Sequence, residues 1–120
     1  MMTLIQDMPP GVVAVRATGH VTGDDYEKVL IPAIDAAHKE HGKIRTLIHF
    51  DEGFAGLTAV AMWDDAKVGL KHLLHFERCA IVTDDDSLRG MIKVAGFLSP
   101  CEIKMFGNKK LDAAIQWIRA

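Results

Sequence analysis

The chain has 120 residues, of which 49% are hydrophobic and 25% are charged, and its formal net charge is -2. A chain of this size and composition can bury one core without a disulfide or a structural metal, and it is too hydrophobic to be disordered. Its 14 Lys and Arg against 16 Asp and Glu, without a basic block, argue against nucleic acid as a partner. We therefore expect one domain over residues 1–120.

The sequence predicts a cytoplasmic protein. Its first residues lack the basic flank and the long apolar run of a secretion signal. No stretch approaches the roughly 18 uninterrupted apolar residues that a membrane span requires. Cys79 and Cys101 lie far apart in apolar surroundings, a pattern typical of reduced and buried thiols.

Two strands and a helix open the predicted fold. Residues 3–7 and 12–18 are predicted strands, since a Pro-Pro-Gly turn joins them and the second is rich in β-branched residues. A weak capping box at Thr22 predicts the start of a helix, which Gly42 ends. Pro32 lies inside this helix and removes a backbone hydrogen bond, so we expect a bend there.

The rest of the chain alternates strands with helices. We expect the third strand at 44–50, a loop at 51–56 and a second helix that starts at a Thr58 cap and ends at about 74. A fourth strand is expected at 79–83, followed by a third helix that ends at about 98, before Ser99-Pro100. A fifth strand at 102–106 and a last helix at 109–119 complete the predicted fold. The order β-β-α-β-α-β-α-β-α predicts an α/β fold with a mostly parallel five-stranded sheet and four helices.

Hydrophobic spacing assigns a buried face to the second predicted helix. The apolar residues that share this face are Ala59, Met62, Trp63, Ala66, Leu70 and Leu73. Apolar residues that recur three and four positions apart are typical of a helix packed against a core. We expect this face to point toward the sheet.

Carboxylates follow the third and fourth predicted strands, where open α/β sheets bind ligands. Asp51-Glu52 and Asp84-Asp85-Asp86 could hold Mg²⁺ and serve a small metal-dependent enzyme. The competing interpretation is that Asp85, Asp86 and Ser87 cap the third helix, where the helix dipole favours negative charge. We favour the capping interpretation.

Six histidines raise a zinc hypothesis. His38 and His41 are three residues apart at a helix end, and His72 and His75 repeat that spacing. Each pair lacks a third ligand within sequence reach, whereas the helix dipole favours histidines near helix C-termini. Since the chain also lacks a nucleophile elbow and a glycine-rich phosphate loop, we expect no catalytic residue, no metal and no cofactor.

Four segments carry a family resemblance that covers nearly the whole chain, and they run from Tyr26 to Ala33, from Met62 to Leu70, from Phe76 to Asp84 and from Gly96 to Pro100. In these segments the chain resembles the SpoIIAA-like group of STAS domains, a fold related to the CRAL-TRIO lipid carriers. The resemblance implies a non-enzymatic domain that acts as an anti-sigma antagonist or carries an apolar ligand. Anti-sigma antagonists have a phosphorylated Ser after the third strand. In this chain residues 50–58 contain no Ser, and Thr58 carries the single hydroxyl group among them.

Apolar excess on the second and third predicted helices suggests where a ligand binds. We expect a groove between them for a lipid-like or other apolar small molecule, or for the membrane surface, lined by Phe54, Leu57, Trp63, Met91, Val94, Phe97 and Leu98. Lys67, Lys71 and Lys93 would meet an anionic head group. The alternatives are solvated lysines, a core role for Trp63, and a protein-interaction module that docks a partner or a second copy on this surface.

Overall fold

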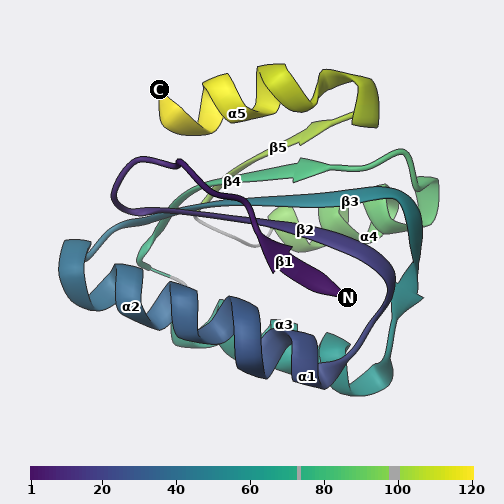
Figure 1. The fold of residues 1–120 in the computed structure, drawn as a ribbon, viewed down its shortest axis with the longest axis horizontal. Coiled ribbons are helices and arrows are strands. Elements are labelled where there is room, and N and C mark those ends of the chain that lie inside the picture. Colours follow the sequence, from purple (N-terminus) through teal and green to yellow (C-terminus); the bar gives the residue numbers. More distant parts are fainter. Residues whose placement is uncertain (73, 98–100) are drawn as a thin grey trace.

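A five-stranded sheet organises the protein, and its strands lie in sequence order, β1-β2-β3-β4-β5 (Figure 1). We describe it from a computed structural model over residues 1–72, 74–97 and 101–120, with the backbone alone at residues 70 and 95–97. The first strand is antiparallel to the second, and all other neighbours are parallel. The predicted α/β fold with a mostly parallel sheet is confirmed.

The elements follow the predicted order. The strands are β1 (Met2–Leu4), β2 (Val12–Val21), β3 (Ile44–Leu57), β4 (Phe76–Val82) and β5 (Glu102–Phe106). The helical segments are α1 (Gly23–Asp25), the π-helical turn η1 (Tyr26–Leu30), α2 (Ile31–His41), α3 (Ala59–Lys71), α4 (Asp86–Phe97), the 3-10 turn η2 (Asn108–Lys110) and α5 (Leu111–Arg119). The first three of these segments are continuous, so they form one long helix.

Helices cover both faces of the sheet (Figure 1). On one face α5 packs Ala114 and Ile118 against alternate strand residues such as Leu47. On the other face the long N-terminal helix, α3 and α4 pack against the opposite alternation, which includes Ile48 and Phe50. This alternation follows from the two-residue side-chain period of a strand, and it gives the protein two separate apolar layers.

The predicted loop at residues 51–56 is wrong, because β3 continues to Leu57. The second half of β3 pairs with the end of β2, and β2 continues to Val21 instead of ending at Gly19. The register shifts around Gly19, whose φ of 61° is open to glycine but costly for other residues. Glycine bulges therefore extend this strand pair where the sequence pattern predicted a break.

Most predicted helix boundaries are confirmed. Thr22 forms a capping box with Asp25, and the Thr58 hydroxyl accepts a hydrogen bond from the backbone N–H of Ala61. Gly42 ends α2 with φ of 75°. In place of a simple bend at Pro32, a π-helical turn lies directly before α2. Residue 98 and the predicted break at Ser99-Pro100 lie outside the described residues.

The predicted buried face of α3 is wrong. Trp63 and Met62 are 65% and 46% exposed, whereas Ala61, Asp64 and Val68 are buried. The helix turns this way because its start packs against α1, where Gly23 leaves room beside Val60 and Asp64. Close backbone approach between the two helices therefore outweighs burial of the larger apolar side chains.

Candidate functional site

A mainly apolar cavity of about 230 Å³ lies between the sheet, α3 and α4. Its walls are Tyr26, Ile48, Phe50, Leu57, Asp65, Cys79, Ile81, Leu88, Met91, Ile92 and Ile103. The aliphatic and aromatic members come from η1, β3, β4, β5 and α4. Ile48 and Phe50 are two residues apart on β3, so strand alternation places both on the same sheet face. Apolar walls with few polar groups are typical of small-molecule sites.

Two wall residues form a polar pair. The Tyr26 hydroxyl donates a hydrogen bond to Asp65 Oδ1 at 3.0 Å. Tyr26 is 1% exposed on the π-helical turn, while Asp65 lies on α3 and keeps much of its surface accessible to solvent. The bond uses Asp65 Oδ1, and Asp65 Oδ2 makes no hydrogen bond to the part of the chain that the structure describes.

The cavity changes the acidity of both groups. Removal from water raises the pKa of the Asp65 carboxyl, and the hydrogen bond from Tyr26 only partly opposes this. Burial and the adjacent carboxylate raise the pKa of the Tyr26 phenol, which therefore stays protonated as a donor. Asp65 is consequently easier to protonate than an ordinary surface carboxylate.

Cys79 is the one thiol in the cavity wall among the described residues. Burial raises its pKa, so the thiol stays protonated. A thiol is a weak nucleophile compared with a thiolate, and neither a histidine nor a lysine lines the same cavity to activate it.

The structure brings together only part of the predicted groove. Leu57 and Met91 line the cavity, but Phe54, Trp63, Lys67 and Val94 do not. Phe54 packs edge-on against Phe50, with ring centroids 4.7 Å apart. The side chain of Phe97 and the whole of Leu98 lie outside the described residues.

The predicted rim lysines have other partners. Lys67 Nζ lies 3.2 Å from Asp64 Oδ1, and Lys71 Nζ lies 3.3 Å from Asp35 Oδ1. Lys93 is exposed on α4. The polar groups found at the cavity are instead Tyr26 and Asp65.

Sequence reasoning missed this polar pair. Tyr26 is buried in the core, but nothing in the sequence pattern indicates that its hydroxyl group has a partner. Asp65 follows Asp64, and helical periodicity cannot decide which of two adjacent carboxylates faces inward. A buried tyrosine always needs a partner for its hydroxyl, and that requirement was the available signal.

The predicted carboxylate candidates are engaged elsewhere. Asp51 Oδ2 accepts from Arg16 Nε at 2.7 Å, and Asp84 Oδ1 accepts from the backbone N–H of Asn108 at 2.9 Å. Asp85 Oδ1 accepts from the backbone N–H of Leu88 at 2.9 Å, which confirms its predicted capping role. These bonds give the three carboxylates structural roles.

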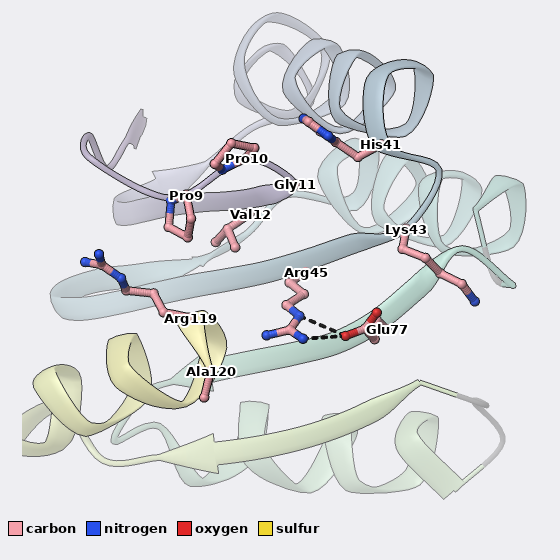
Figure 2. A pocket seen from close by; sticks show the side chains of 10 residues that line it. All are labelled: Pro9, Pro10, Gly11, Val12, His41, Lys43, Arg45, Glu77, Arg119 and Ala120. Carbon is pink, nitrogen blue, oxygen red and sulfur yellow. Dashed lines mark hydrogen bonds and ion pairs between the residues drawn. The ribbon is translucent and has the colours of Figure 1, made fainter.

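A second hollow, of about 330 Å³, lies at the opposite end of the strands (Figure 2). It is rich in basic side chains, but Arg45 Nε and Nη2 both donate to Glu77 Oε1, at 2.9 and 2.6 Å. Arg45 Nη1 donates to the backbone oxygen of Ile118 in α5. The guanidinium therefore joins β3, β4 and α5, and its bonding is that of a structural group.

The fold places the chain among the STAS-type α/β domains, and its sequence matches the profile of the SpoIIAA-like family over residues 12–119. The chain belongs to the SpoIIAA-like family. The resemblance deduced from the sequence is thereby confirmed. None of the curated proteins matches the sequence with significance.

Two solved structures are similar over nearly their whole lengths. One is an uncharacterized protein of the DUF3478 family with a SpoIIAA-like fold from Shewanella loihica PV-4. It is 31% identical, with a TM-score of 0.74 and coverage of 98% of this chain and 92% of that one. The other is the anti-sigma factor antagonist SpoIIAA in its unphosphorylated form, 11% identical, with a TM-score of 0.60 and coverage of 97% and 98%. The second likeness concerns the fold alone.

Within the described residues, no helix has the length and apolar character needed to cross a bilayer.

Proposed function

We propose that the cavity between the sheet, α3 and α4 binds a small apolar molecule that carries one hydrogen-bonding group. The observation that supports this most directly is the Tyr26–Asp65 pair in an otherwise apolar wall. In such sites apolar walls supply the affinity, and a few polar groups fix the ligand's orientation. The free oxygen of Asp65 would pair with the ligand's polar group.

The cavity volume limits the ligand to a small one. Drug-sized ligands occupy pockets of about 300–1,000 Å³, whereas an apolar cavity of about 150 Å³ accepts benzene. A volume of about 230 Å³ lies between these values. It fits a monocyclic aromatic compound or a short acyl chain better than a complete phospholipid.

The raised pKa of Asp65 favours an uncharged or anionic head group. Its carboxyl group takes up a proton more readily than usual, and a protonated carboxyl donates a hydrogen bond to a hydroxyl or carboxylate oxygen. The Tyr26 hydroxyl holds the carboxyl in place. We therefore favour a short-chain acid or alcohol, bound without chemical conversion.

The test combines a ligand series with two matched variants. Octanoic acid, octanol and octylamine share one chain and differ in head group, so calorimetric titration compares head groups directly. Ile103→Phe fills the cavity, whereas Met105→Phe adds an aromatic ring on the same strand and the same sheet face outside the cavity walls. We expect acid or alcohol binding that Ile103→Phe abolishes and Met105→Phe retains. Equal binding by the two variants, or no binding by the wild type, contradicts the proposal.

A second candidate function is docking of a protein partner or a membrane on α3. The observation that favours it is the exposure of three apolar side chains, Val60, Met62 and Trp63, at 57%, 46% and 65%. Exposed apolar groups that gather on one helix are common at interaction surfaces. A regulatory, anti-sigma-antagonist-like role would use this surface without the cavity.

One substitution separates the two functions. Trp63→Lys changes the exposed α3 surface, and Trp63 is not a wall residue of the cavity. Loss of partner capture or of sedimentation with anionic liposomes, with octanoate binding intact, would support the docking function. Loss of octanoate binding alone in Ile103→Phe would support the carrier function.

A further inference from the structure

Three histidines from separate segments meet beside the C-terminal ends of α2 and α3. His38 lies in the last turn of α2, and His72 and His75 follow α3. One nitrogen atom from each ring lies within 4.8 Å of the others. The ring centroids of His38 and His75 are 4.0 Å apart, and those of His38 and His72 are 4.9 Å apart. His38 is thus the third residue that the sequence spacing of His72 and His75 lacked.

Hydrogen bonds determine which nitrogen atoms remain open. His38 Nδ1 lies 3.1 Å from the backbone oxygen of Gly42, and His72 Nε2 lies 2.8 Å from Asp35 Oδ1. Both oxygens accept, so these nitrogens carry the protons in the neutral rings. The lone pairs are then at His38 Nε2 and His72 Nδ1.

Two of the ring nitrogens are buried and unpaired. Neither His72 Nδ1 nor His75 Nδ1 has a hydrogen-bond partner within the described residues. The His72 side chain is 4% exposed, so its free nitrogen does not face bulk water. Leaving a buried ring nitrogen unpaired is costly, and two such nitrogens in one cluster favour a ligand that binds them both.

We propose that His38, His72 and His75 bind a divalent transition metal ion, with Zn²⁺ as the best match. Three imidazoles are a common zinc ligand set, in which a water molecule takes the fourth position. Asp35 would act as a positioning residue, since a carboxylate that accepts from the second nitrogen of a ligating histidine orients the ring. Zn–N distances of about 2.0–2.1 Å place tetrahedral nitrogens about 3.4 Å apart, so the ligating nitrogen atoms need to approach one another by up to about 1.4 Å.

The charges around the cluster are of both signs. Asp35 supplies a negative charge next to His72, although Lys71 Nζ shares the same carboxylate oxygen at 3.3 Å. Lys43 also adds positive charge near His75. The site lies beside the start of β3, where the backbone N–H of Ile44 donates to the His75 oxygen at 2.9 Å. None of the three histidines is a wall residue of the apolar cavity, so this proposal stands independently of the proposed function.

The experiment titrates metal-stripped protein with Zn²⁺ in competition with a chromophoric chelator, and with Co²⁺ followed by visible absorption. We expect one Zn²⁺ per chain and the intense d–d bands of four-coordinate Co²⁺. His38→Gln and His75→Gln should each weaken Zn²⁺ binding at least tenfold, and Asp35→Asn by about 10–100-fold. The matched control is His20→Gln, which removes an exposed histidine outside the cluster and should leave affinity unchanged.

Several results would overturn the proposal. They are an absence of stoichiometric Zn²⁺ binding by the wild type, equal loss of affinity in His20→Gln and His38→Gln, and a Co²⁺ spectrum of the weak octahedral type. Circular dichroism checks that each variant is folded. A Zn²⁺-dependent rise in the unfolding temperature of the wild type, reduced in a folded His38→Gln protein, provides a second readout.

Discussion

The Tyr26 hydroxyl group lies 3.0 Å from Asp65 Oδ1, so one hydrogen bond joins the π-helical turn of the N-terminal helix to the middle of α3. Both residues line the apolar cavity. Because Tyr26 is fully buried, the geometry of this wall depends on a contact between residues 39 positions apart.

Removal of this hydrogen bond should lower stability modestly. Tyr26→Phe keeps the ring, and we expect a loss of about 1 kcal/mol in the free energy of unfolding by urea. The penalty stays near this value because solvent can reach the acceptor, Asp65. The same substitution in an Asp65→Ala background should cost much less, since the partner is already gone. Equal costs in the two backgrounds would rule out the bond as the cause.

The acidity of Asp65 predicts a pH dependence with a definite sign. Its pKa is higher in the folded state than the ordinary value of about 3.9, so the folded chain binds more protons between the two values. Stability from this group is therefore complete below about pH 4 and falls as the pH rises through the folded pKa. Asp65→Asn cannot titrate, so its stability relative to the wild type should improve as the pH rises from about 4 through the raised pKa of folded Asp65. Parallel stability curves for the two proteins contradict this.

The contact between α1 and α3 predicts the effect of a single methyl group. A Cβ at Gly23 would lie 2.4 Å from Val60 Cγ1, so Gly23→Ala should cost about 1–3 kcal/mol through overpacking. Val60→Ala in the same chain should recover part of the loss. Gly69→Ala is the matched control, because its Cβ meets no atom of the described residues within 4 Å, and it should gain up to about 1 kcal/mol in the free energy of unfolding. Thermal or urea unfolding measures all four proteins.

The Arg45 guanidinium predicts a difference between arginine and lysine. It donates to Glu77 through two nitrogens (Figure 2). Its third nitrogen donates to the backbone oxygen of Ile118. Arg45→Met should lower the free energy of unfolding by about 1–3 kcal/mol. Arg45→Lys should lower it by more than half of that amount, because an ammonium group cannot make this forked contact. Glu77→Gln should cost less than about 1 kcal/mol because the carboxylate is partly exposed. If Arg45→Lys has the same free energy of unfolding in urea as the wild type, a positive charge at this position is sufficient for stability and the forked contact is not needed.

Local signals were sufficient to predict the fold. Alternating strand and helix patterns gave the correct element order, and Thr22, Thr58 and Gly42 marked helix boundaries through their own backbone chemistry. Gly53 misled the prediction because glycine is also typical of loops. Here it lets β3 approach β2, where a Cβ would lie 2.9 Å from the Thr18 hydroxyl oxygen.

The candidate sites were harder to predict because they depend on tertiary contacts. Hydrophobic spacing predicts that Trp63 is buried, but the close approach of α1 buries Asp64 and leaves the indole of Trp63 exposed. His38 is 34 positions from His72, and only the packing of α2 beside α3 brings the rings together. Sequence spacing within one helix cannot reveal a ligand supplied by another.

The extended pairing of β2 with β3 has a mechanical consequence. Val21 and Leu57 are paired in register, and the backbone N–H of Thr58 donates to the Val21 oxygen at 2.9 Å. The long N-terminal helix and α3 thus start from neighbouring ends of the same strand pair. If α3 moves to admit a ligand, the neighbouring helix must pivot with it about a shared anchor. We expect ligand exchange to be a concerted displacement on the microsecond-to-millisecond scale of collective motions, rather than a fast side-chain rotation.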